Sequence, residues 1–358
     1  MIVSLLVLNS ILLLITVSLL IAERFFVPSG ECEIIINKEK SFKVQPGSSL
    51  LSYLAEKKIF IPSACGGKAT CGHCKIKVLS GGGDILPTEE VFITRSEKNS
   101  GIRLACQVKV KKSIEIYIPE HLFGAQEFEA VVTNLYDLTH DIKYVCLKLI
   151  KPEKISFKPG QYIQIKIPGT DEFRAYSIAS PPSKQNIIEL TVRLVPGGLC
   201  STYIHQVMEI GDKVVLIGPF GDFYLREDSN RKIVAIGGGC GMAPIRSIIY
   251  YLKEKNMPRQ FIYFFGARQR RDLFYTEELK KIEEEYPNFK FIPALSEPRP
   301  SDHWDGEVGL ITQVVEKYLE SGENTEAYLC GPPPMIDAAI KVLTKKGIPE
   351  NYIYYDKF

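Results

Sequence analysis

The sequence predicts a membrane-anchored, multidomain chain of α+β and α/β class, and three observations support this prediction. The chain opens with 21 residues, 2–22, that carry no charge. Apolar and polar residues alternate in the middle of the chain, as in 162–167 and 188–194, which predicts an antiparallel β-barrel. From residue 233 onward strand and helix patterns alternate, which predicts a parallel sheet with crossover helices.

Length and composition set the outer limits of this organisation. At 358 residues the chain is two to three times as long as an ordinary domain of about 100–200 residues. Lys and Arg number 44 against 42 Asp and Glu, so the chain lacks the strong basic excess typical of nucleic-acid-binding proteins. Two weak seams divide the chain, and we expect an anchor and three domains with the boundaries 1–24, 31–120, 127–228 and 229–358.

The first element is the uncharged N-terminal segment, 2–22. It contains 16 residues that are Ile, Leu, Val or Ala, and a helix of this length spans the roughly 30 Å hydrocarbon core of a bilayer. A secretory signal peptide is the main alternative, but no basic residue precedes Ile2 and residues 22–25 form a poor cleavage site. A buried core helix is a third interpretation. Basic residues downstream of the segment predict that the body of the chain lies in the cytoplasm.

A cluster of cysteines marks the first soluble domain. Cys65, Cys71 and Cys74 lie on one glycine-rich loop, and 31 residues separate the last of them from Cys106. Four thiolates in this pattern can hold a [2Fe–2S] cluster. A structural zinc site is the alternative, but zinc ribbons prefer two C-x2-C pairs and only one occurs here. His73 lies in the same loop, but Rieske-type centres need two histidines, so we expect it on the surface or behind the ligands.

The middle domain carries two motifs that suit a flavin nucleotide. On a predicted strand, the Arg174 cation can pair with a diphosphate, the Tyr176 ring can stack on an isoalloxazine, and the Ser177 hydroxyl can bond a ring nitrogen. The second motif, 197–202, is glycine-rich and precedes a predicted helix over 202–208, whose N-terminus offers N–H donors to a pyrophosphate. A barrel without ligand is the alternative interpretation.

The third domain has glycine turns at the ends of predicted buried strands. Residues 237–241 form a run of four glycines and one cysteine after the strand 233–236, with Pro244 at the start of the next helix. This run does not contain G-x-G-x-x-G, so the Rossmann fingerprint is absent, yet the turn still suits a phosphate. A second turn begins with Cys330 and Gly331 after the last core strand, at the edge where open α/β sheets bind ligands.

The order of these motifs resembles the ferredoxin-linked branch of the ferredoxin–NADP⁺ reductase superfamily, over residues 31–358. With the anchor, the five-residue first cysteine gap, the stretch 294–304 and the chain end 355–358, the chain is most similar to the family of F subunits, the NADH-oxidising subunits of sodium-pumping NADH:quinone oxidoreductases. The resemblance implies a β-grasp-like [2Fe–2S] ferredoxin domain, an FAD barrel and an NAD(H)-binding domain. It also implies integral-membrane redox partner subunits, quinone as terminal acceptor, and a single-pass location in the bacterial inner membrane.

The resemblance also assigns residues to each cofactor. It implies that Cys65, Cys71, Cys74 and Cys106 hold the cluster, and that Ser177 and Cys330 flank the hydride path as catalytic residues. The remaining cofactor-binding residues that it implies are Arg174, Tyr176, Gly198, Leu199, Cys200, Ser201, Gly237, Gly238, Gly239, Gly241 and Gly331. Phe358 is expected to shield the isoalloxazine until the nicotinamide enters.

One departure from that family keeps a second function open. Its members usually carry an insertion ahead of the Arg-x-Tyr-Ser strand, whereas here only eleven residues separate Tyr162 from Arg174. The compact form resembles reductase components of soluble oxygenases, so an NADH-dependent reductase for a soluble acceptor is the alternative. A passive electron-carrying protein is a third hypothesis, which the intact glycine turns disfavour. NADH is expected over NADPH, because Glu297 would repel a 2′-phosphate.

Overall fold

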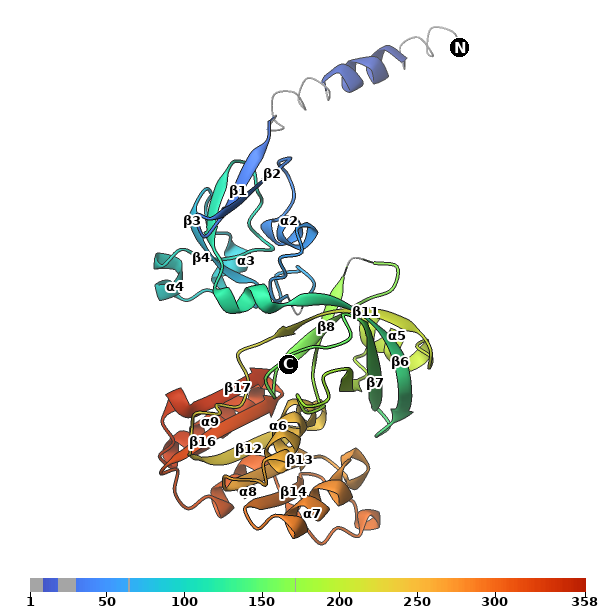
Figure 1. Ribbon diagram of the computed structural model, residues 1–358, viewed down its shortest axis with the longest axis vertical. Helices are drawn as coiled ribbons and strands as arrows, with labels where there is room; N and C mark the ends of the chain where they lie inside the picture. The colour runs from blue at the N-terminus through green and yellow to red at the C-terminus, as the bar shows by residue number, and fades with distance from the viewer. Residues whose placement is uncertain (1–8, 19–29, 64, 171) are drawn as a thin grey trace. The chain divides into compact units, whose positions relative to one another are not determined.

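The computed structural model describes residues 9–18, 30–63, 65–170 and 172–358, and it divides into two compact units, Met1–Phe123 and Gly124–Phe358 (Figure 1). Residues 9–18 are helical, with exposed side chains. The remainder of the predicted span, 2–8 and 19–22, lies outside the described residues. Within the described parts of the chain, no helix combines the length and apolar character needed to cross a membrane.

The first unit is built on a five-stranded mixed sheet in the order β2-β1-β5-β3-β4. The strands are β1 (Cys32–Ile36), β2 (Lys40–Val44), β3 (Lys75–Ser80), β4 (Ile102–Leu104) and β5 (Ile114–Tyr117). Alternate residues of β1 are buried, because successive side chains of a strand point to opposite faces. They form one hydrophobic core with Leu50 and Leu54 of helix α2 (Leu50–Glu56), which Ser49 caps by accepting from the N–H of Ser52.

A buried ion pair fixes the short helix α3 (Pro87–Glu90), which is followed by α4 (Arg95–Asn99). Glu89 on α3 has no exposed surface and lies 2.6 Å from the guanidinium of Arg103 on β4. Burial alone raises the pKa of Glu89, but bonds from Arg103 and from backbone N–H groups outweigh it and hold the pKa below its usual value. The pair therefore joins α3 to the strand that leads into Cys106.

The second unit begins with a six-stranded antiparallel sheet in the order β10-β7-β6-β11-β8-β9. The strands are β6 (Gln126–Asp137), β7 (Ile142–Lys151), β8 (Tyr162–Lys166), β9 (Phe173–Ser177), β10 (Ile187–Arg193) and β11 (Lys213–Phe220). The sheet curls until its ends meet, since the N–H of Ala179, just after β9, donates to the carbonyl of Glu189 on β10 at 2.7 Å. The predicted antiparallel pairing is confirmed.

The rest of the second unit is a parallel sheet in the order β15-β14-β13-β12-β16-β17, which confirms the predicted parallel arrangement. The strands are β12 (Lys232–Gly238), β13 (Phe261–Ala267), β14 (Phe289–Leu295), β15 (Glu307–Val308), β16 (Thr325–Gly331) and β17 (Ile353–Lys357). Helices α6 (Met242–Glu254) and α7 (Thr276–Glu285) share one core with one face of the sheet, and α8 (Ile311–Tyr318) and α9 (Pro333–Lys345) share another with the opposite face. β17, at the chain end, was not predicted.

The strand order reverses between β12 and β16. From β12 the chain adds β13, β14 and β15 on one side and then returns to place β16 and β17 on the other. At such a switch point the connections leave in opposite directions, which opens a crevice at the carboxyl ends of the strands. Both predicted glycine turns begin within these strands: Gly237 and Gly238 end β12, and Cys330 and Gly331 end β16, so each strand runs two residues further than predicted.

The curled sheet and the parallel sheet are joined through Arg246 of α6, a residue that is 8% exposed. Its guanidinium lies 2.7 Å from Glu189 on β10 and 3.1 Å from Glu278 on α7. The next residue, Ser247, donates its hydroxyl to the carbonyl of Ser180 at 2.7 Å. Two neighbouring residues of one helix therefore bind the other sheet directly.

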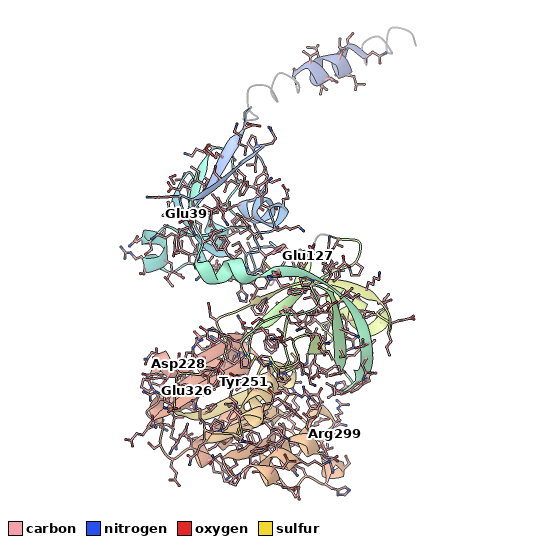
Figure 2. All side chains as sticks on the ribbon, viewed as in Figure 1. Glu39, Glu127, Asp228, Tyr251, Arg299 and Glu326 are labelled. Atoms are coloured by element: carbon pink, nitrogen blue, oxygen red, sulfur yellow. The ribbon has the colours of Figure 1, made fainter. Side chains whose placement is uncertain are left out.

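The connector between the two sheets contains Asp228, and hydrogen bonds tie it to β16, which carries Glu326, and to α6, which carries Tyr251; these three residues are labelled in Figure 2. The N–H of Arg226 donates to the Tyr328 hydroxyl at 2.9 Å, and that hydroxyl donates to the buried carboxylate of Glu326 at 2.8 Å. Glu227 accepts a hydrogen bond from the hydroxyl of Tyr251 on α6. Backbone and side chains of the connector are thus fixed to β16 and α6.

We predict that Arg246→Ala lowers the free energy of unfolding of the second unit by about 3 kcal/mol, because it leaves the Glu189 carboxylate buried with one cation fewer. Trp304 is the only tryptophan of the chain and lies in this unit, so urea unfolding followed by its fluorescence reports on the unit alone. Lys345→Ala, which breaks an exposed pair with Glu316, serves as the control and leaves the midpoint unchanged. Equal midpoints for Arg246→Ala and the unsubstituted protein would contradict the assigned role.

Candidate functional site

The four predicted cluster cysteines form two pairs in the structure. The sulfur atoms of Cys65 and Cys71 lie 3.4 Å apart, and Cys74 and Cys106 share a second side-chain hydrogen bond. The bond from Cys71 lowers the pKa of Cys65 to about 4, and the bond from Cys74 lowers the pKa of Cys106 to about 7. In the described residues, no group of three or more His, Cys, Asp or Glu is arranged to hold one metal ion.

The paired thiols fit a two-iron cluster, in which four cysteines supply two thiolates to each iron. The loop between Cys71 and Cys74 depends on Gly72, whose φ of +70° and close approach to the Phe92 ring both exclude a side chain. Cys74 itself is fixed to the neighbouring strand, since its carbonyl accepts from the N–H of Ala105 at 2.8 Å. His73 is exposed.

The two predicted flavin motifs lie against each other. Arg174, Tyr176 and Ser177 are partly buried residues of β9, and the Tyr176 phenol hydrogen-bonds the buried Cys200 thiol. Burial, together with Cys200, raises the pKa of Tyr176. The Arg174 guanidinium lies 2.6 Å from Glu172 and donates to the carbonyl of Phe173, which leaves further N–H groups for a diphosphate.

The helix after the second flavin motif begins earlier than the sequence predicted. Helix α5 spans Leu199–Gln206, not 202–208, and Gly198 is its N-cap. The glycines of this motif therefore end the preceding loop, and residues 199–201 form the first helical turn. Their N–H groups have no partner within the helix, so the anion-binding end lies at Leu199, Cys200 and Ser201.

Ser201 has a second role in this loop. Its side chain is buried, and its hydroxyl accepts from the N–H of Val195 at 3.1 Å and lies 3.2 Å from the carbonyl of Gly198. These contacts close the loop 195–201 and hold the helix N-terminus in place. Because the Ser201 hydroxyl is engaged by these contacts, a cofactor would bind the backbone N–H of Ser201 instead.

The glycine turn after β12 is shaped by close packing. Gly239 has a φ of +55°, and a side chain there would collide with the guanidinium of Arg193 from β10. At Gly241 a side chain would collide with the carbonyl of Cys330 on β16. Gly237 and Gly238 are packed in the same way against Tyr263 and Met335. The turn therefore lies directly at the switch point, where its glycines let the backbone pass close to Arg193 and β16.

The second turn and the chain end lie at the same edge of the sheet. Cys330 is completely buried, and burial raises the pKa of its thiol well above the usual range. It pairs in register with Gly237 on one side and with Asp356 of β17 on the other. The N–H of Phe358 donates to the carbonyl of Gly331 at 3.3 Å, while about half of the Phe358 side chain is exposed.

Two residues of this site were missed by the sequence analysis. Arg193 ends β10, lies over the Gly239 turn and pairs with Asp141 at 3.1 Å, so it brings a cation from the curled sheet to the phosphate seat of the parallel sheet. Asp356 lies beside Cys330, and burial raises its pKa to about 6. A basic residue directly ahead of the second flavin motif was the one available signal for Arg193. Asp356 lies in the chain end 355–358 that supports the resemblance, but no role was assigned to it from the sequence, because β17 was not predicted.

Both nucleotide seats suit the ligands that the motifs predict. At α5, the cradle is a helix N-terminus beside a guanidinium and a tyrosine ring, which suits a flavin diphosphate. At the β12 turn, added Cβ atoms at Gly239 and Gly241 would collide with Arg193 and with the Cys330 carbonyl, so only glycine fits there, and the Arg193 cation beside the turn suits a phosphate.

Comparison with known families matches three domains along the chain. Residues 34–111 match a 2Fe-2S iron-sulfur cluster binding domain, 129–224 an oxidoreductase FAD-binding domain, and 235–341 an oxidoreductase NAD-binding domain. The predicted cofactors, [2Fe–2S], FAD and NAD(H), are confirmed at this level.

Comparison with curated proteins gives relatives over nearly the whole chain. The F subunit of the Na(+)-translocating NADH-quinone reductase of Actinobacillus succinogenes is 40% identical over 397 residues, covering 98% of this chain and 97% of the relative. That of Neisseria meningitidis is 39% identical, covering 97% and 96%. The chain belongs to the family of F subunits of the Na(+)-translocating NADH-quinone reductase. The predicted resemblance to these F subunits is therefore confirmed. The alignments exceed the 358 residues of this chain, so the relatives carry residues that it lacks.

Among solved structures, the cytochrome P450 reductase of Amycolatopsis has a TM-score of 0.75 and 30% identity, and covers 91% of this chain and 98% of its own. The ferredoxin reductase in carbazole 1,9a-dioxygenase has a TM-score of 0.70 and 26% identity, covering 92% and 98%. This member of the quinone reductase family thus shares its three-domain build with reductases of oxygenase systems.

We predict that Gly241→Ala raises the KM for NADH at least about tenfold while FAD content stays unchanged, because a displacement of 1 Å in a binding turn can cost up to about a hundredfold. The φ of −60° at Gly241 suits alanine, so the effect comes only from contact with Cys330. Gly124→Ala is the matched control, since its new Cβ meets nothing within 4 Å. Unchanged steady-state kinetics for Gly241→Ala would show that the turn tolerates movement.

A second prediction concerns Asp356 and pH. Because its pKa is raised to about 6 in the folded state, the stability it contributes is present below its unfolded pKa and lost as pH rises through 6. We expect Asp356→Asn to raise the melting temperature over the unsubstituted protein at pH 7.5 and less so at pH 4.5, in NADH-free protein. Asp228→Asn changes an exposed carboxylate and shows no such trend (Figure 2). A gain that is the same at both pH values would contradict the assignment.

Proposed function

We propose that this chain oxidises NADH in its second unit and delivers single electrons through the cluster of its first unit to integral-membrane partner subunits that reduce quinone. The observation that carries the proposal is the 38–40% identity to quinone reductase F subunits over 94–98% of the chain. When bound, FAD takes a hydride from NADH and gives up electrons one at a time, which matches a two-electron donor to a one-electron centre.

Residues of β9 and α5 would hold the flavin. Arg174 pairs with the diphosphate through N–H groups beyond its bonds to Glu172 and Phe173. Tyr176, fixed by Cys200, stacks on the ring system, and Ser177 bonds a ring nitrogen and orients it toward the nicotinamide. The first-turn N–H groups at 199–201, after the Gly198 cap, receive the pyrophosphate.

The crevice between β12 and β16 would hold the nicotinamide nucleotide. Gly237, Gly238, Gly239 and Gly241 present their backbone to the phosphates, and Arg193 supplies the neighbouring cation. Gly331 and the buried Cys330 form the facing wall, at which the nicotinamide ring is placed. Phe358, whose N–H donates to the carbonyl of Gly331, would shield the flavin until the nicotinamide enters.

The cluster would be held by the two cysteine pairs of the first unit. The thiols of Cys65 and Cys71 would bind one iron, and those of Cys74 and Cys106 the other, because the partners within each pair already lie at hydrogen-bond distance. Binding releases the protons that each pair shares.

The anchor, partners and location follow from the sequence and the family. Residues 2–22 would cross the bacterial inner membrane once and leave both units in the cytoplasm. This segment contains no ionisable group and therefore offers no relay for ions across the membrane.

NADH rather than NADPH is the proposed donor. Glu297 follows β14, at the edge of the sheet where the nucleotide binds, and its N–H donates to the carbonyl of Arg268 at 2.9 Å. A carboxylate at this edge repels a 2′-phosphate, although Arg299 lies two residues further on.

We predict that Cys106→Ala removes the signal of the reduced cluster in electron paramagnetic resonance and abolishes NADH:quinone activity in membranes. Reduction of FAD by NADH persists, because the two units have separate hydrophobic cores. Cys32→Ala, a buried cysteine of the same unit outside the predicted ligand set, keeps both signal and activity. If deleting the whole gene leaves membrane NADH:quinone activity intact while a soluble oxygenase loses its electron supply, the chain serves a soluble acceptor instead.

A further inference from the structure

A chain of side-chain hydrogen bonds ends on one of the cluster cysteines. The Thr88 hydroxyl of α3 lies 2.9 Å from the Oε1 atom of Gln107, and the Nε2 atom of Gln107 lies 3.6 Å from the Cys106 sulfur. Gln107 is partly buried and Thr88 is exposed, so neither residue is part of the hydrophobic core. We propose that Gln107 donates a hydrogen bond to the Cys106 thiolate that raises the reduction potential of the cluster, and that Thr88 positions the Gln107 amide.

The orientation of the amide follows from the chemistry of its two neighbours. A thiolate is an acceptor only, so the Gln107 end that faces Cys106 must be the NH₂ group. The carbonyl oxygen then faces Thr88, whose hydroxyl can donate to it. The opposite orientation would place a carbonyl oxygen against the thiolate. The thiolate therefore selects the orientation that places a donor on sulfur, and the Thr88 hydroxyl supports it by donating to the carbonyl oxygen at 2.9 Å.

Rigid surroundings hold both ends of this chain in place. Thr88 precedes Glu89, which the ion pair to Arg103 and the N–H of Leu104, at 3.0 Å, fix to β4. On the other side, the N–H of Gln107 donates to the carbonyl of Leu104 at 2.8 Å. The C-terminal end of β4 therefore binds both α3, through Glu89, and the backbone of Gln107.

A donor at this position favours the reduced cluster. Reduction adds one electron, and part of its charge falls on the ligating sulfur atoms. A hydrogen bond to a more negative acceptor is stronger, so the bond stabilises the reduced form more than the oxidised form. This inference rests on the proposed assignment of Cys106 as a cluster ligand.

The test is a redox titration of the cluster in the full-length, cofactor-loaded protein, followed by electron paramagnetic resonance. Gln107→Leu is expected to lower the equilibrium constant for cluster reduction by up to about tenfold, which is 59 mV for one electron. Thr88→Val lowers it less and in the same direction, while Thr88→Ser keeps the hydroxyl and restores the original potential. Gln45→Leu, an exposed glutamine of the same unit, is the matched control and leaves the potential unchanged.

Each outcome bears on a different statement. If the unsubstituted protein shows no cluster signal, the proposed function fails. If the signal is intact but Gln107→Leu and the unsubstituted protein have equal potentials, the hydrogen bond does not tune the cluster. If Gln107→Leu does not hold a cluster, the two Thr88 variants test the hydrogen bond instead. Equal cluster potentials for Thr88→Val and Thr88→Ser overturn the proposal. A lower potential for Thr88→Val alone supports it.

Discussion

The second unit depends on one buried cation. Arg246 on α6 binds Glu189 of the curled sheet and Glu278 of α7, and it also donates to the carbonyl of Ala179. A guanidinium has five donors in a fixed plane, so it can hold three partners at once in directions that a lysine could not match. Lys184 completes the charge balance on the shared carboxylate at 2.8 Å. This junction, together with the bond from Ser247 to Ser180, helps to fix the two sheets of the unit relative to each other, and with them the two proposed nucleotide sites.

Chemistry explains why these two seats share one unit whereas the cluster lies in another. Hydride transfer needs reacting atoms about 3–3.5 Å apart and aligned, so the flavin and the nicotinamide must be held by one rigid framework. A single electron moves without a bond being formed, and its donor and acceptor need no such alignment. The chain reflects this difference: the two sheets of the second unit are joined by buried polar contacts, while the cluster unit has a core and a buried ion pair of its own.

Elements with a repeating hydrophobic pattern were predicted correctly from the sequence. Elements and residues whose position depends on a tertiary contact were not. Alternation and glycine turns predicted the antiparallel and parallel sheets, because burial on one or both faces leaves a periodic trace. The start of α5 was wrong by three residues, since the choice of Gly198 as N-cap depends on Ser201 closing the loop beneath it. β17 was missed because its extended backbone is held by pairing with β16, a contact that the sequence of β17 alone does not indicate. Arg193 and Asp356 acquire meaning only from what lies opposite them in space.

The cluster loop illustrates the same division within a few residues. Cysteine spacing was enough to predict the cluster, because ligand identity and order along the chain are sequence properties. The surroundings of each sulfur are not: Gln107 follows Cys106 directly, yet its effect depends on Thr88, which a buried carboxylate brings to it. Glu89 is an exception to the rule that charged side chains lie at the surface, because it has no exposed surface. It is stable only because Arg103 and two backbone N–H groups satisfy it. The buried charge fixes the residues that surround Cys106, which we propose as a cluster ligand, and such fixed surroundings tune a bound metal group.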